Sequence, residues 1–251
     1  MSTNPVDLMT ERLLDEAGLA PGWTVVDIGC GPGAVTRMIA RRVGPGGRVL
    51  AVDRDPAMLD MTRRMAADEG LANVSVIEGG FDAELPGHGT IDAIVGRRVL
   101  MYQADPVAAV EALARALGPG RVVAFHEHDA SKLVPGRHPL PLHDEVRDWL
   151  AKMLSREGAR LDMGLTLHEV MSAAGLAVES VRAEANLLTP DSSYPVGMIV
   201  RAVMPRLERF GITDMASADP DTLDERLRQE RQANGATCLW ELVFRAVARK
   251  V

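Results

Sequence analysis

The sequence predicts an α/β fold in which a mostly parallel sheet carries helices on both faces. Short apolar, β-branched runs alternate with longer segments whose apolar residues recur every three to four positions, as expected for strands that alternate with helices. The first such run, Val25–Ile28, ends in three glycines at alternating positions, Gly29, Gly31 and Gly33, and a helical pattern follows at once. A strand, a glycine-rich turn and a helix form the layout of a nucleotide-binding crossover unit.

The second predicted strand, residues 48–53, ends in Asp53, about 20 residues after the last glycine of the turn. A carboxylate at this place can accept hydrogen bonds from both hydroxyls of an adenosine ribose, and it repels a 2′-phosphate. The glycine spacing is G-x-G-x-G rather than the G-x-G-x-x-G of dinucleotide-binding proteins. Asp27 also lies inside the end of the first strand, two residues before the first glycine. Both details argue against a dinucleotide ligand.

The segment Asp27–Gly33 together with Asp53 resembles the class I S-adenosylmethionine (SAM) methyltransferases. The resemblance implies a Rossmann-like, seven-stranded, mostly parallel sheet, with SAM as the cofactor and S-adenosyl-L-homocysteine (SAH) as the product. It also implies cofactor contacts from Asp27, Gly29, Gly31, Gly33, Asp53, Arg54, Met58, Phe81, Asp82 and Arg97. The alternative interpretation of the glycine motif is a tight strand-to-helix turn that binds no ligand.

The segment after the third predicted strand, residues 73–78, resembles the family's third cofactor-contacting loop. An acid of that loop accepts a hydrogen bond from the adenine amino group in the family, and Phe81 and Asp82 are the matching residues here. The sequence departs from the family at Gly80-Phe81, where an acidic residue is commoner just before the small one. The sequence therefore leaves open which residue meets the amino group.

Three further positions carry two interpretations each. Met58 begins a predicted helix and either packs on the adenine ring or belongs to the core. Arg97 follows the fourth predicted strand, residues 90–95, and either pairs with the SAM carboxylate or is a solvated or sheet-capping arginine. Tyr102 lies just beyond, and it either orients an acceptor and accepts its proton or packs as a buried amphipathic side chain.

Four ionisable residues, His126–Asp129, end the fifth predicted strand, which follows a Gly-Pro-Gly turn at residues 118–120. The carboxyl ends of parallel strands form the ligand-binding edge of such a sheet. Because side chains alternate along a strand, the two histidines share one face and the two acids share the other. Glu127 and His128 are therefore candidates for a general base, beside Tyr102. Otherwise they are polar residues at a solvated strand end. No second cluster of metal ligands accompanies them, so no metal is expected.

The chain is predicted to form one methyltransferase domain. Two inserted, mainly helical segments are predicted to cap the acceptor pocket, and the second has a helix starting at Asp219-Pro220. Trp149, Tyr194 and Met198 are candidate pocket residues, and core packing is the alternative for each. Apolar faces of the inserted helices are candidate surfaces for a homodimer. The predicted domain covers residues 1–251, with a core at about 20–130, 160–190 and 237–251 and cap segments at about 131–160 and 191–236.

Composition restricts the partners. The net charge is −7 and no basic cluster occurs, which argues against a nucleic acid and favours a small-molecule acceptor. No apolar run approaches the ~20 residues of a membrane-spanning helix, and no export signal is visible, so no membrane is expected as a partner. The two cysteines, Cys30 and Cys238, suggest a reducing compartment, and we expect a cytoplasmic protein.

The resemblance implies in-line displacement of the SAM methyl group by a small acceptor. The whole chain is similar to bacterial small-molecule methyltransferases of secondary metabolism, and its cap pattern is similar to enzymes that methylate an indole ring carbon. An aromatic or heteroaromatic acceptor is therefore expected, with a Glu, His or Tyr assisting proton removal. The alternative is a SAM-binding protein with non-methylating chemistry, such as a SAM-using cyclase or a regulatory subunit.

Overall fold

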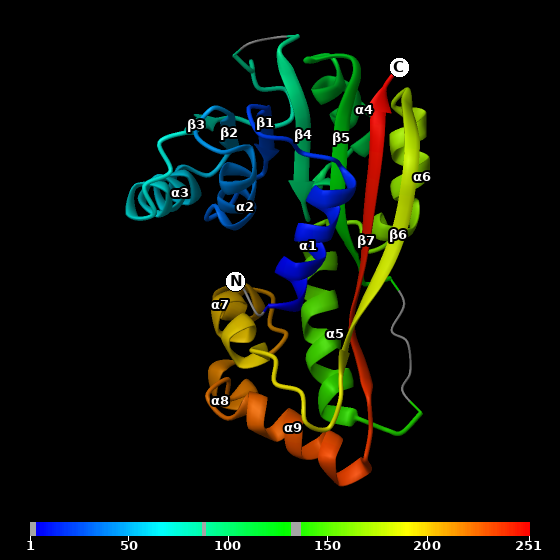
Figure 1. Ribbon diagram of the computed structural model, residues 1–251. Helices are drawn as coiled ribbons and strands as arrows, with labels where there is room; N and C mark the ends of the chain where they lie inside the picture. Colours follow the sequence, from blue (N-terminus) through cyan, green and yellow to red (C-terminus); the bar gives the residue numbers. More distant parts are fainter. Residues whose placement is uncertain (1–3, 87–88, 132–136) are drawn as a thin grey trace. The chain divides into compact units, whose positions relative to one another are not determined.

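The computed structural model describes residues 4–86, 89–131 and 137–251. Within these residues seven strands form one sheet, in the order β3-β2-β1-β4-β5-β7-β6 (Figure 1). The strands are β1 (Thr24–Ile28), β2 (Arg48–Asp53), β3 (Val74–Glu78), β4 (Ile91–Arg97), β5 (Leu117–Asp129), β6 (Leu176–Leu188) and β7 (Cys238–Lys250).

Helices connect most of these strands. No helix of the described residues is long and apolar enough to cross a membrane. The helices are α1 (Pro5–Glu16), α2 (Ala34–Val43), α3 (Pro56–Asp68), the 3₁₀ helix η1 (Leu100–Tyr102), α4 (Pro106–Ala114), α5 (Pro141–Arg156), α6 (Met163–Ala173), α7 (Val196–Arg209), α8 (Met215–Ala218) and α9 (Leu223–Asn234).

The order of the sheet reverses at β1. This strand pairs in parallel with β2 on one side and β4 on the other, and the β2–β3 and β4–β5 pairs are also parallel. Because crossovers between parallel strands are right-handed, connections that run in opposite directions place their helices on opposite faces. α2 contacts both α1 and α3, whereas α4 contacts α6. β7, which lies between β5 and β6, points in the direction opposite to β4 in Figure 1. The predicted fold class, a mostly parallel sheet with helices on both faces, is confirmed.

The chain divides into two compact units. The first unit contains β1 to β4, most of β5, and helices α1 to α4 and α6. The second contains α5, α7, α8 and α9. β6 and β7 each contribute residues to both units. The first unit comprises residues 1–127, 163–183 and 244–251, and the second comprises residues 128–162 and 184–243. The expected single domain with a cap stays a prediction.

Three helices of the first unit begin at the same local signal. Asn4, Asp55 and Asp105 each precede a proline, and each side chain accepts a hydrogen bond from a backbone N–H two or three residues further on, at 2.9 to 3.0 Å. A short polar acceptor at the N-cap and a proline at the first helical position both favour a helix start. The starts of α1, α3 and α4 are therefore set by adjacent residues of the sequence.

Two element boundaries differ from the prediction. β5 begins at Leu117, so the expected Gly-Pro-Gly turn lies inside the strand, and its pairing with β4 shifts register between Ile91 and Ala93. Asp219 has φ 42° and ends α8, so the next helix begins at Leu223 rather than at the expected Asp-Pro pair. Pairing with β4 overrides the turn signal at residues 118–120. The end of α8 at Asp219 displaces the start of the next helix.

The core of the first unit is apolar and continuous. It contains side chains from β1, α2, β2, β4 and β5 that are fully buried, among them Val25, Ile39, Val49, Ala93 and Val122. Burial of apolar surface stabilises such a cluster by about 25 cal/mol per Å². The alternate residues Val26, Leu50 and Ile94 are fully buried as well, so the turns that follow β1, β2 and β4 project from strands covered on both faces.

The second unit holds a buried polar network around His143 of α5. The His143 ring is fully buried, with its Nδ1 2.6 Å from Glu230 and its Nε2 2.8 Å from the Arg231 guanidinium. Because Arg231 can only donate, the Nε2 must accept, and the Nδ1 proton donates to the carboxylate. Burial lowers the pKa of His143, the Arg231 charge lowers it further, and Glu230 opposes both. The network therefore holds a neutral histidine.

We expect the H143Q variant to reduce the acid sensitivity of the fold. A lowered pKa in the folded state stabilises the protein above the unfolded-state value of about 6.5, and that stabilisation is lost as the pH falls below it. Urea unfolding at pH 7.5 and 5.5 measures the difference, with a limit of about 1.4 kcal/mol per pH unit for one proton. The exposed His168 supplies the control variant, H168Q. Equal pH dependence in wild type and H143Q would contradict the assignment.

Candidate active site

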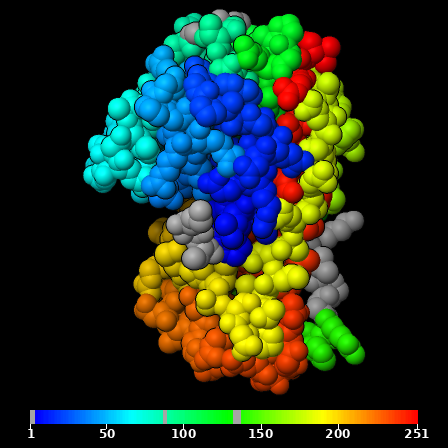
Figure 2. All heavy atoms as spheres, viewed as in Figure 1, coloured from blue at the N-terminus to red at the C-terminus, as the bar shows by residue number. Residues whose placement is uncertain are grey.

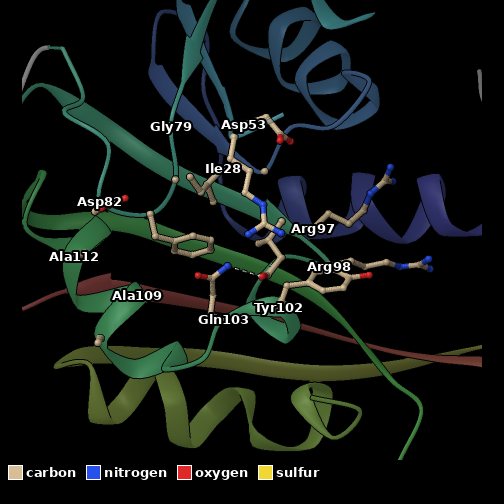
Figure 3. A pocket seen from close by; sticks show the side chains of 16 residues that line it. Ile28, Asp53, Gly79, Asp82, Arg97, Arg98, Tyr102, Gln103, Ala109 and Ala112 are labelled. Carbon is tan, nitrogen blue, oxygen red and sulfur yellow. Dashed lines mark hydrogen bonds between the residues drawn. The ribbon is translucent and has the colours of Figure 1, made fainter. Parts of the chain in front are cut away.

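A cavity of about 770 Å³ lies in the first unit at the carboxyl ends of β1, β2, β3 and β4. This is the edge of the sheet beside the reversal of strand order, where ligands bind in open α/β folds. Side chains of Asp53, Asp82, Tyr102 and Gln103 surround it (Figure 3). The lining residues are Ile28, Gly29, Asp53, Arg54, Gly79, Gly80, Phe81, Asp82, Arg97, Arg98, Val99, Tyr102, Gln103, Ala108, Ala109 and Ala112.

The turn after β1 needs glycine for two different reasons: a positive φ and the close approach of another segment. Gly29, Gly31 and Gly33 have φ values of 67°, 53° and 91°, which L side chains rarely adopt. A Cβ at Gly29 would also lie 2.3 Å from Cγ1 of Val99, whereas a Cβ at Gly31 would meet no atom within 4 Å. Of Gly29 and Gly31, therefore, only Gly29 is required by the close approach of another chain segment.

The carboxylate of Asp53 is fixed by two backbone groups. Its Oδ2 accepts from the N–H of Gly31 at 2.8 Å, and its Oδ1 accepts from the N–H of Asp55 at 3.0 Å. Each carboxylate oxygen has a further lone pair. The carboxylate lines the cavity, so it is oriented to accept two more donors that lie side by side, such as the hydroxyls of a ribose.

Asp27 lies beneath the glycine turn and is 1% exposed. Its Oδ2 accepts a hydrogen bond from the Thr36 hydroxyl at 2.5 Å. Burial raises the pKa of Asp27 to about 7, although the Thr36 bond and the Arg97 charge oppose the shift. The side chain is not among the residues that line the cavity. Its contact with the cofactor stays a prediction.

Arg97 lines the cavity and also holds α1. Its Nη1 lies 3.0 Å from Oδ1 of Asp7 and donates to the Thr10 hydroxyl at 3.2 Å. α1 forms part of the outer surface of the first unit, dark blue in Figure 2. The Arg97 side chain is therefore partly buried, and Asp7 already supplies a counter-charge. Its pairing with the SAM carboxylate stays a prediction.

The other predicted cofactor residues fall into two groups. Arg54, Phe81 and Asp82 line the cavity, as Gly29 and Asp53 do. Met58 is partly exposed on α3, and it does not line the cavity, nor do Gly31 and Gly33. The loops after β2 and β3 therefore meet at the cavity.

The three candidate catalytic residues have different surroundings. Tyr102 is 40% exposed and lines the cavity. Glu127 is fully buried, and its Oε1 accepts from the backbone N–H groups of Val99 and Leu100. His128 is partly exposed and belongs to the second unit. The structure therefore places one of the three, Tyr102, in the cavity.

The predicted acceptor-pocket residues lie in the second unit. Trp149 and Tyr194 are buried, and the Tyr194 ring centre lies 6.4 Å from that of Trp240. Met198 is 65% exposed, so core packing does not explain it. The role of these three residues in binding an acceptor stays a prediction.

Several lining residues were not predicted from the sequence. Val99 and Gln103 follow β4, and the Gln103 amide donates to the Val99 carbonyl at 3.3 Å (Figure 3). Ala108, Ala109 and Ala112 come from one face of α4. The helical spacing of these alanines is a usable signal, because small residues at such positions let another group approach.

No group of three or more metal-ligating side chains occurs among the described residues. The charged groups of the cavity are instead two carboxylates and three guanidinium groups, from Asp53, Asp82, Arg54, Arg97 and Arg98. Such groups bind and orient a polar ligand through hydrogen bonds and charge.

A family model described as a methyltransferase domain matches residues 19–175. Aklanonic acid methyltransferase DauC from Streptomyces sp. (strain C5) is 35% identical over 119 residues, which is 47% of this chain and 53% of that protein. Nocamycin O-methyltransferase from Saccharothrix syringae is 39% identical over 116 residues, 45% of this chain and 41% of that protein. The chain spans about half the length of the curated relatives it matches.

A solved structure has the same fold. Geranyl diphosphate C-methyltransferase from Streptomyces coelicolor A3(2), in complex with Mg²⁺, geranyl-S-thiolodiphosphate and SAH, superposes with a TM-score of 0.60 at 18% identity, covering 97% of this chain and 76% of that chain. The family model covers more than half of the sequence. The chain therefore belongs to the methyltransferase domain family, whose cofactor is SAM.

We expect the G29A variant to bind SAH much more weakly than the G31A variant. Both substitutions place an L side chain at positive φ, at a cost of about 1–2 kcal/mol. Only G29A also forces Val99 away from the turn. Isothermal titration with SAH, together with thermal unfolding, measures the two effects. Equal affinities in the two variants would show that the approach of Val99 to Gly29 is unimportant for binding.

Proposed function

We propose that this protein transfers the methyl group of SAM to a small natural-product acceptor. The observation that carries the proposal is the cavity at the sheet reversal, with Asp53 held by Gly31 and Asp55 at its edge. The relatives named as methyltransferases of aklanonic acid and nocamycin support an acceptor of this class.

The chain's own residues would hold the two substrates and exclude water. Asp53 would accept from the ribose hydroxyls, Phe81 and Asp82 would lie at the adenine, and Arg97 would face the carboxylate. SAM supplies an electrophilic methyl group, which an acceptor displaces in line from the sulfur. The main contributions of the protein are then alignment and a dry site. A base is needed only where the nucleophile must lose a proton.

We infer an aromatic or heteroaromatic acceptor, an indole ring carbon being the most specific form of this proposal. Phe81, Tyr102 and three alanines of α4 give the cavity apolar surface beside its charged groups. Such a mixture suits a flat ring with one or two polar substituents. The net charge of −7 supports a small molecule rather than a nucleic acid. Both cysteines are free and buried, which supports a cytoplasmic protein, and a homodimer remains part of the proposal.

The test is SAH formation by the purified protein with SAM and a panel of aromatic natural products. We expect turnover, and we expect D53A to weaken SAH binding by about 10- to 150-fold, because hydrogen bonds to a charged group contribute ~1.5–3 kcal/mol. D55A is the matched control, since it removes a helix cap but keeps the N–H that Asp53 accepts. It should bind SAH within about threefold of wild type.

Two outcomes would overturn the proposal. If calorimetry detects no heat of binding with either SAM or SAH, the protein does not use SAM as its cofactor. Binding of SAM without SAH release for any acceptor would favour the alternative, a SAM-using cyclase or a regulatory subunit.

Tyr102 and His128 are the proposed proton acceptors. Loss of a general base lowers turnover by about 100-fold or more. We expect Y102F or H128A to show this loss at saturating SAM, with SAH affinity unchanged. Wild-type turnover in both variants would show that neither side chain removes a proton.

A further inference from the structure

The turn after β4 is held by the end of β5 through three consecutive backbone N–H groups. The N–H of Arg98 donates to the His126 carbonyl at 2.8 Å. The N–H groups of Val99 and Leu100 both donate to Oε1 of Glu127, at 2.9 Å each. One buried carboxylate oxygen therefore fixes the two residues at which η1 begins.

The backbone of this turn is in a conformation that needs such support. Arg98 has φ 56°, in the left-handed region. A non-glycine residue there is strained, and it persists where the surrounding structure fixes it. The bonds from Glu127 begin at the very next residue, so they hold the chain in the direction that Arg98 imposes.

The same turn touches the glycine turn of the cofactor site. Val99 is 8% exposed. Its Cγ1 lies 2.3 Å from the position that a Cβ at Gly29 would take, and its Cγ2 lies 2.8 Å from the position of a Cβ at Gly96. Val99, Tyr102 and Gln103 all line the cavity. A shift of the turn would therefore move the cavity wall and its contact with Gly29 together.

We propose that Glu127 is a positioning residue, whose carboxylate sets the turn after β4 and thereby holds Val99 against the glycine turn and Tyr102 at the cavity. This assignment replaces the expectation that Glu127 removes the acceptor proton. It rests on the proposed function only for its turnover measurement, because SAH binding is measured without an acceptor.

The surroundings of Glu127 are those of a cap rather than of a base. Its two N–H donors use the Oε1, and within the described part of the chain its Oε2 is buried without a hydrogen-bond partner. The side chain does not line the cavity. A general base must reach the proton that it removes, directly or through one water. Burial raises the pKa of Glu127 to about 7, and the backbone N–H groups oppose that shift.

The experiment compares E127Q with E127A. Glutamine keeps a carbonyl oxygen that accepts both N–H groups, whereas alanine leaves them without an acceptor. We expect E127Q to keep SAH affinity and turnover within about threefold of wild type, and E127A to lose about 10-fold or more in SAH affinity. Amide hydrogen exchange of residues 98–103 should become faster in E127A alone.

Asp92 provides a control at the opposite end of β4. Its Oδ2 accepts from the Thr24 N–H at 2.8 Å and its Oδ1 pairs with Arg121, so D92A also removes a carboxylate that binds backbone, but far along the strand from the cavity. D92A should lower thermal stability and leave SAH affinity unchanged. This separates a specific effect on the turn from a general loss of stability.

Two results would overturn the assignment. If E127A, measured while folded, binds SAH as wild type does and shows unchanged exchange at residues 98–103, Glu127 does not position the turn. If E127Q and E127A both lose about 100-fold in turnover with normal SAH affinity, Glu127 is a base. A wild type that binds SAH but methylates nothing would contradict the proposed function while leaving the binding and exchange measurements valid.

Discussion

The site depends on the close approach of two turns, one after β1 and one after β4. These strands are neighbours at the reversal of the sheet, so their carboxyl ends meet without any intervening element. Val99 occupies the space that a side chain at Gly29 would need. Asp53 then fixes the same glycine turn from the β2 side through Gly31. The glycine turn is thus fixed by β1, β2 and β4 together, and it forms part of the cavity wall.

Local signals predicted the parts of the site that lie within one strand and its following turn. The glycine turn and the acid that ends β2 carry their information in a few adjacent residues, and the structure has them where expected. The starts of α1, α3 and α4 are equally local, since each is set by an Asn-Pro or Asp-Pro pair. The extension of β5 through Gly118–Gly120 depends on pairing with β4, which no local pattern records. Strand alternation likewise predicted the face of β5 on which Glu127 lies. It could not show that the partners of Glu127 are two backbone N–H groups, because every residue except proline has such a group, whatever its side chain.

Burial accounts for the two most perturbed carboxyl groups of the first unit. Asp27 and Glu127 lie at the ends of β1 and β5, and both have a pKa near 7 because desolvation disfavours the charged form. Their partners differ: a hydroxyl for Asp27 and backbone N–H groups for Glu127. A bound cation would favour ionised Asp27, whereas Glu127 already has the donors that stabilise its charge. The same shift therefore marks a carboxyl group beneath the glycine turn in one place and the cap of a neighbouring turn in the other.

The second unit is assembled from two separate stretches of chain, residues 128–162 and 184–243. His143 comes from the first stretch, and both of its partners, Glu230 and Arg231, come from the second. Recombination between related enzymes, whether natural or in the laboratory, must therefore exchange both stretches at once to keep this network complete. A chimera that swaps one stretch alone would bury an imidazole among side chains that never evolved beside it.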